Sequence, residues 1–226
     1  MNDKPLQLRG MYIFSAVTLI ILFLLSFYAW GQLPADAQIP VHFDASGEPD
    51  RYGGKLEGLF LLPAIVSLTV LLLACVPQIQ PRKSNLIDSQ KAYKAIWGSV
   101  LVLFIVVHAT VIAAVLGTPI NIVPVVPVAV GALFVVLGNY MGKTRSNWVM
   151  GIRTPWTLES ELAWDKTHRL GGKLFVVLGL LFMVSAIVIT GELWAYLIVV
   201  GSLGITAFLT VYSYMVWKTD PNVQSK

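Results

Sequence analysis

The sequence predicts an all-α polytopic membrane protein with six transmembrane helices, cytoplasmic N and C termini, and an ordered outer loop between the first two helices. Of the 226 residues, 56% are hydrophobic and only 12% are charged, whereas soluble domains are about 25% charged. The apolar residues form long segments, and the basic residues lie mainly in alternate connections between them. The bilayer is therefore the expected solvent.

Six segments are apolar and nearly free of charge, and each is close to the roughly 20 residues that cross the hydrocarbon core as a helix. Helices are expected because lipid cannot satisfy backbone polar groups. The last two segments should form a tight hairpin that turns at Gly191-Glu192. The predicted spans are Met11–Trp30, Leu59–Val76, Ala95–Leu116, Ile122–Tyr140, Leu174–Thr190 and Leu193–Trp217.

The basic residues predict the orientation. Fourteen of the 16 lysines and arginines lie at the termini or in the second and fourth connections, and only Arg51 and Lys55 lie on the other side. The positive-inside rule places the basic side in the cytoplasm. The net charge of +4 is therefore mainly a topology signal. Direct nucleic-acid binding is not expected, since the basic residues are spread over several loops without a nucleic-acid-reading motif.

Two units are expected along the chain. Residues 1–94 should form a two-helix unit with an outer loop at 31–58 and an inner surface helix. Residues 95–226 should form a four-helix unit with an inner motif loop at 141–173. The surface helix is predicted to begin near Leu86, because Asn85 followed by Asp88 resembles a capping box.

The outer loop contains a short strand pattern, in which Val41 and Phe43 alternate with polar residues. Three interpretations of its charged residues remain open. Asp44 and Asp50 suit turn caps. An oxygen-and-imidazole metal site is the second interpretation, although the spacing differs from an EF-hand, and its ligands would be His42, Asp44, Glu48 and Asp50. An external ligand is the third, and its candidate binding residues are His42, Phe43, Asp44, Asp50, Arg51 and Tyr52.

The inner motif, Asn147–Gly172, is polar and rich in tryptophan. Gly151 permits unusual backbone angles, and Thr157 is expected to cap a surface helix. Gly171-Gly172 is expected to end that helix before the fifth span, and Asp165 should pair with Arg169 at i,i+4.

Three interpretations of this inner motif also remain open. A cytoplasmic partner would bind a docking surface made of Asn147, Arg153, Trp156, Trp164, His168 and Arg169. Alternatively, Trp164 anchors a plain surface helix among lipid headgroups. The third interpretation is catalysis by His168 with Asp165 or Glu161, which no nucleophile or metal motif supports.

His108 is an ionisable residue in the middle of the third span, and such groups are functional candidates. Bonding of neutral His108 to a neighbouring helix is favoured. The alternative is a small transporter in which His108 is a proton-linked group. Gly138-x-x-x-Gly142 is a candidate for close helix contact.

Both polar loops together resemble the SdpI family of bacterial membrane proteins. The outer resemblance rests on Ile39–Phe43 and Gly47–Gly53 with Lys55. The inner resemblance rests on Asn147, Met150–Leu158, Trp164, Thr167–Arg169 and Gly171.

The resemblance implies a non-enzymatic immunity and signalling protein in the bacterial cell (inner) membrane. Besides the lipid bilayer, the implied partners are a secreted toxic peptide outside and a cytoplasmic regulator inside. No cofactor or metal is expected. A transporter, and less so an enzyme acting at the inner face, remain the alternatives.

Overall fold

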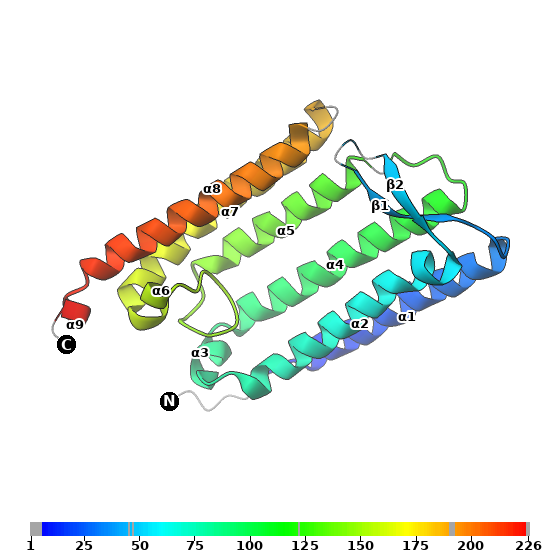
Figure 1. Ribbon diagram of the computed structural model, residues 1–226. Coiled ribbons are helices and arrows are strands. Elements are labelled where there is room, and N and C mark those ends of the chain that lie inside the picture. Colours follow the sequence, from blue (N-terminus) through cyan, green and yellow to red (C-terminus); the bar gives the residue numbers. More distant parts are fainter. Residues whose placement is uncertain (1–5, 45, 47, 122, 190–192, 225–226) are drawn as a thin grey trace.

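The computed structural model describes residues 6–44, 46, 48–121, 123–189 and 193–224. Long helices run between the two ends of the molecule, and both termini lie at the same end (Figure 1). A two-stranded hairpin covers the opposite end. The long helices are α1 (Arg9–Gln32), α2 (Lys55–Ile79), α4 (Gln90–Val115), α5 (Val125–Met141), α7 (Glu161–Val188) and α8 (Leu193–Lys218). The short helices are α3 (Lys83–Asp88), α6 (Pro155–Glu159) and α9 (Pro221–Gln224).

Five of these helices are long and apolar enough to cross a membrane, whereas α5 has 17 residues. The chain is thus a mainly helical, multi-pass membrane protein. Six complete spans and a cytoplasmic position of both termini remain predictions. The expected turn at Gly191-Glu192 lies outside the described residues.

The predicted strand is confirmed as β1 (Ile39–Phe43), which pairs antiparallel with β2 (Pro49–Gly53). Ile39 is fully buried and packs with Leu59 of α2 and Ile112 of α4. A Cβ on Gly58 would lie 2.5 Å from the Cβ of Ile39. The hairpin therefore seats directly on α2, where only a glycine permits this approach.

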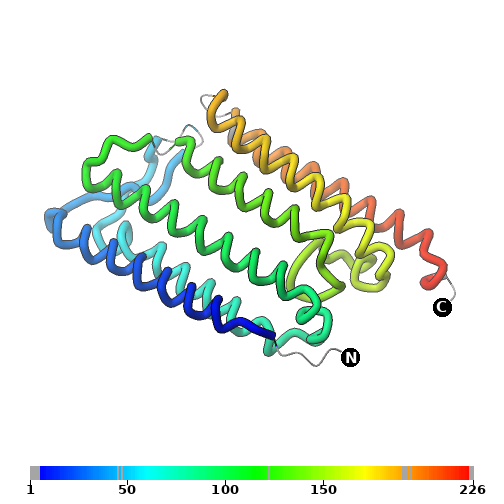
Figure 2. The backbone as a smooth tube through the Cα atoms, turned by 180° about the vertical axis from the view of Figure 1, so that it is seen from behind, coloured from blue at the N-terminus to red at the C-terminus, as the bar shows by residue number. Residues whose placement is uncertain are grey.

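Both views show the long helices side by side in two groups (Figures 1 and 2). Helix α4 packs on α1 and α2, while α5 packs on α7, and α7 packs on α8. We call the first group the hairpin unit and the second the motif unit. Helices α4 and α5 face each other where the two units meet. The division expected between residues 94 and 95 remains a prediction.

Helices α5 and α7 make the closest helix contact in the described chain. A Cβ on Gly138 would lie 2.5 Å from the carbonyl oxygen of Gly172, and a Cβ on Gly131 would lie 2.5 Å from that of Gly179. Small residues permit such backbone approach in membranes. The expectation that Gly171-Gly172 ends a helix was wrong: α7 continues through both, and Gly172 serves helix packing instead.

Replacing Gly138 with alanine should destabilise the protein. The added methyl would meet the backbone of α7, and such overpacking typically costs about 1–3 kcal/mol. Gly204→Ala on α8 is the matched control, because nothing lies within 4 Å of its Cβ position. Thermal unfolding in detergent should show a lower Tm only for Gly138→Ala. Equal Tm values would contradict the close crossing.

Candidate functional site

The exposed surface of the outer hairpin carries two pairs of polar side chains. The Nδ1 atom of His42 lies 2.6 Å from Oδ1 of Asp50. Arg51 pairs with Glu57 of α2 at 2.7 Å. Both pairs are well exposed to solvent, so their contribution to stability is small.

Asp44 organises the turn between the strands. Its Oδ1 accepts hydrogen bonds from the backbone amides of Ser46 and Glu48, at 2.8 and 2.9 Å. The prediction that Asp44 caps a turn is confirmed. Within the described residues, no group of three or more His, Cys, Asp or Glu side chains is placed to hold a metal ion.

Two apolar pockets lie beneath β1. One, of about 290 Å³, lies between Phe43 and the hairpin-side halves of α4 and α5. The other, of about 260 Å³, is lined by Pro40, Phe43 and His108. Phe43 lines both pockets, whereas Tyr52 of β2 is 53% exposed. The hairpin thus offers polar groups to solvent and covers an apolar space within the helices.

His108 joins three helices and lines the second of these pockets. Its Nε2 lies 3.0 Å from Oγ of Ser26 and 3.2 Å from the carbonyl oxygen of Leu22. Ser26 donates its hydroxyl hydrogen to the carbonyl of Leu59, so Nε2 of His108 is the donor to both α1 atoms. The expected bonding of His108 to a neighbouring helix is therefore confirmed.

The inner motif is built around His168, which is 1% exposed. The backbone amide of Ile152 donates to Nε2 at 2.9 Å. Nδ1 lies 2.8 Å from the carbonyl oxygen of Trp164, which can only accept. His168 is therefore neutral with its proton on Nδ1. Both ring nitrogens are hydrogen-bonded to backbone groups, so neither is free for acid–base catalysis.

Gly151 explains how the chain approaches His168. Its φ is +102°, and a Cβ there would lie 2.2 Å from Nε2 of His168. The predicted unusual conformation at Gly151 is confirmed. The same residue meets two requirements, since it adopts the left-handed conformation and leaves space for the imidazole ring.

Trp164 stacks on His168 with ring centroids 3.9 Å apart. Its Nε1 donates to the carbonyl of Thr144, and only 2% of the residue is exposed. The interpretation of Trp164 as a headgroup anchor was therefore wrong. Asn147 is likewise buried, and its side chain holds the turn through the amides of Val149 and Met150.

The expected surface helix is split into α6 and α7. Thr154, not Thr157, is the N-cap of α6, and Ser160 caps α7 by accepting from the amide of Ala163. Thr157 instead forms a reciprocal capping box with Thr154. The expected single cap was wrong because Pro155 begins a helix as its first residue.

The connection between α2 and α4 clamps the motif, which the sequence did not indicate. Arg82 donates to Oγ of Ser146 and to the carbonyl of Leu158. Asn85 donates to the carbonyl of Ser146 at 2.6 Å. Asn85 was expected to cap a helix, but it lies inside α3 and forms no cap. Sequence spacing could not reveal these contacts between residues 61 to 76 positions apart.

The remaining predicted docking residues lie nearer the surface. Arg153 is exposed and donates to the carbonyl of Trp148, whose own side chain is 51% exposed. Trp156 packs against Tyr214 of α8. Arg169 forms the predicted exposed pair with Asp165. The structure therefore divides the predicted docking set into a buried framework and an accessible rim.

The segment after α8 attaches to the same end of the molecule. Ser160 donates to Oδ2 of Asp220, and the amide of Asn222 donates to Oδ1 at 3.0 Å. Hydrogen bonds to the ionised carboxylate lower the pKa of Asp220 below its ordinary value, with the bond from Ser160 as the main cause.

Known proteins resemble this chain at both of these sites. Residues 143–213 match the SdpI/YfhL protein family, and residues 17–66 match a domain of unknown function, DUF1648. The immunity protein SdpI of Bacillus subtilis (strain 168) is 26% identical over 208 residues, which cover 91% of this chain and 95% of that protein. An uncharacterized protein of Archaeoglobus fulgidus is 30% identical over 84 residues, covering 35% and 44% of the two chains. No solved structure matches.

Replacing Gly151 with alanine should destabilise the inner motif by more than the strain of a positive φ alone. Gly117→Ala is the control, since Gly117 also has a positive φ, +86°, but nothing within 4 Å. A left-handed residue with a Cβ costs about 1–2 kcal/mol, and Gly151→Ala adds the clash with His168. Denaturation should give a clearly larger loss for Gly151→Ala. Equal losses would contradict the His168 contact.

Acid should weaken the attachment of Asp220. Because its folded pKa is lowered, its stabilising contribution is present above the unfolded pKa, about 3.9, and is lost as the pH falls through the lower folded pKa. Asp220→Asn should remove this part of the pH dependence. Proteolysis of the C-terminal segment across acidic pH would measure it, and identical profiles for both proteins would oppose the assignment.

Proposed function

We propose that this chain, whose residues 143–213 match the SdpI/YfhL protein family, protects a bacterium against a secreted toxic peptide from within its cell membrane. The outer hairpin contacts the peptide, and the inner motif binds a cytoplasmic regulator. The relative named an immunity protein, which aligns over nearly its full length, supports the immunity role.

The observation that carries the proposal is the position of the outer hairpin over two apolar pockets. A peptide that attacks membranes must present apolar side chains, and Phe43 borders a space that accepts them. Tyr52, Asp50 and Arg51 are exposed on β2 and offer polar contacts. Aromatic and arginine residues are also the side chains that most often dominate binding energy.

The rim of the inner motif is the proposed docking surface for the regulator. An open pocket there is lined by Arg82, Trp148 and Arg153 together with α6 residues. Buried His168, Trp164 and Asn147 hold the backbone beneath it. These buried residues act as positioning residues, while the exposed arginine and tryptophan make the contacts.

The transporter alternative has less support. Nε2 of His108 already donates to two acceptors of α1, and the adjoining pocket is lined mainly by apolar side chains. A proton relay needs several ionisable partners. Proton-linked uptake that disappears in His108→Ala proteoliposomes would restore this alternative.

Tyr52→Ala should weaken protection of a toxin-sensitive host challenged with secreted toxic peptides. A loss of about 1.4 kcal/mol of binding free energy lowers the affinity about tenfold. About tenfold less peptide should then kill the host. Tyr28→Ala is the control, since Tyr28 is 59% exposed on the side of α1. If the wild-type protein gives no protection against any such peptide, the immunity proposal fails.

A double change of Trp148 and Arg153 to alanine should abolish capture of a regulator by the full-length protein while leaving protection intact. Lys173→Ala, an exposed change on α7, is the control. Pull-down from cytosol of toxin-challenged cells measures capture. Equal capture by the double variant would contradict the proposed docking surface but would not bear on the proposed immunity role.

A further inference from the structure

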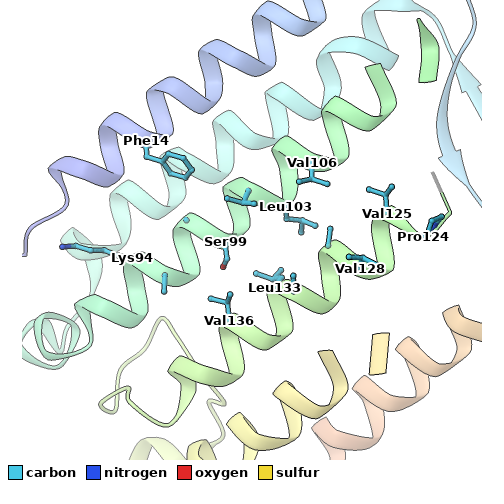
Figure 3. A pocket seen from close by; sticks show the side chains of 15 residues that line it. Phe14, Lys94, Ser99, Leu103, Val106, Pro124, Val125, Val128, Leu133 and Val136 are labelled. Carbon is cyan, nitrogen blue, oxygen red and sulfur yellow. The ribbon is translucent and has the colours of Figure 1, made fainter. Parts of the chain in front are cut away.

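A long apolar groove lies between α4 and α5, where the hairpin unit and the motif unit meet. Its volume is about 900 Å³. Figure 3 shows its walls, with Leu103 and Val106 on α4, and Val128 and Leu133 on α5. Phe14 of α1 borders it at one side. We call this space the seam groove.

Small side chains explain why the seam groove is open. Gly98 on α4 and Ala129 and Ala132 on α5 contribute almost no volume to it. A Cβ on Gly98 would meet only the Cε atom of Met11, at 3.8 Å. At the α5–α7 crossing, glycines bring backbones together, whereas here the small residues leave unfilled space. Such a void is costly unless another molecule fills it.

The seam groove has one charged end. Lys94 lies at the end near the termini, and Pro124 and Val125 lie at the hairpin end. Ser99, the other polar lining residue, donates its hydroxyl to the carbonyl of Ile96. No hydrogen bond or ion pair engages Lys94 among the described residues, so its ammonium group is available to a ligand.

The dimensions and the charge match one kind of occupant. From Lys94 to Val106 the groove follows twelve residues of helix, or roughly 18 Å at 1.5 Å per residue. One leaflet of hydrocarbon is about 15 Å thick. A single acyl chain therefore fits along the groove while its headgroup remains at the level of Lys94.

We propose that the seam groove binds an acyl chain of an anionic phospholipid, with Lys94 pairing with the phosphate. Because α4 belongs to the hairpin unit and α5 to the motif unit, the bound chain fills the junction between them. The lipid thereby stabilises the relative position of the outer hairpin and the inner motif.

Native mass spectrometry of the full-length protein, with phosphatidylglycerol or phosphatidylcholine added, tests this proposal. Wild-type protein should retain phosphatidylglycerol preferentially, and its Tm should rise more with that lipid. Gly98→Leu should reduce lipid retention several-fold because the leucine side chain fills the groove. Leucine also has a higher helix propensity than glycine, so α4 should remain folded. Gly204→Leu on α8, also with free space, is the matched control.

Lys94→Gln should remove the preference for the anionic lipid. Lys173→Gln removes the same charge at an exposed position of α7 and should leave that preference unchanged. Equal retention of both lipids by wild-type protein would overturn the proposal. So would unchanged lipid retention in Gly98→Leu. If the wild-type protein forms a dimer that Gly98→Leu abolishes without loss of lipid, a second copy occupies the groove and the proposal is likewise overturned.

Discussion

The close crossing of α5 and α7 is the contact on which the inner end of the molecule depends. Gly138 near the end of α5 and Gly172, the last residue of the inner motif, bring the two backbones together. This approach aligns Trp164 with the carbonyl of Thr144, just beyond α5. His168 then meets Ile152, and Gly151 leaves the space that His168 needs. A wider crossing would separate all of these pairs.

The buried side chains of His108, Ser26 and His168 follow a common physical rule. Apolar surroundings make unpaired polar groups costly, so His108 and Ser26 bond to carbonyls of neighbouring helices. At the inner end His168 does the same for the turn that contains Ile152. The two histidines that resemble catalytic or proton-carrying groups are therefore structural donors and acceptors. In the proposed function, exposed residues make the contacts with the partners.

Local patterns predicted the long helices, the strand at Val41 and Phe43, and the bonding of His108. They failed where the decisive partner lies far along the chain. Gly171-Gly172 resembles a helix end locally, but its packing partner Gly138 is supplied by another helix. Trp164 resembles an interfacial anchor, yet Thr144 and His168 bury it. The exposed members of the predicted sites, Tyr52 and Arg153 among them, were identified correctly as accessible groups, while their partners remain proposals.

The outer and inner sites lie at opposite ends of a helix bundle, and the seam groove lies between their two units. Peptide binding at the hairpin would be expected to change the hairpin and the pockets beneath it first. Hydrogen–deuterium exchange of the full-length protein in lipid nanodiscs, with and without a toxic peptide against which it protects, tests this most directly. The account predicts slower exchange in residues 39–53 and in the outer part of α4. Slower exchange elsewhere with none in the hairpin would contradict it.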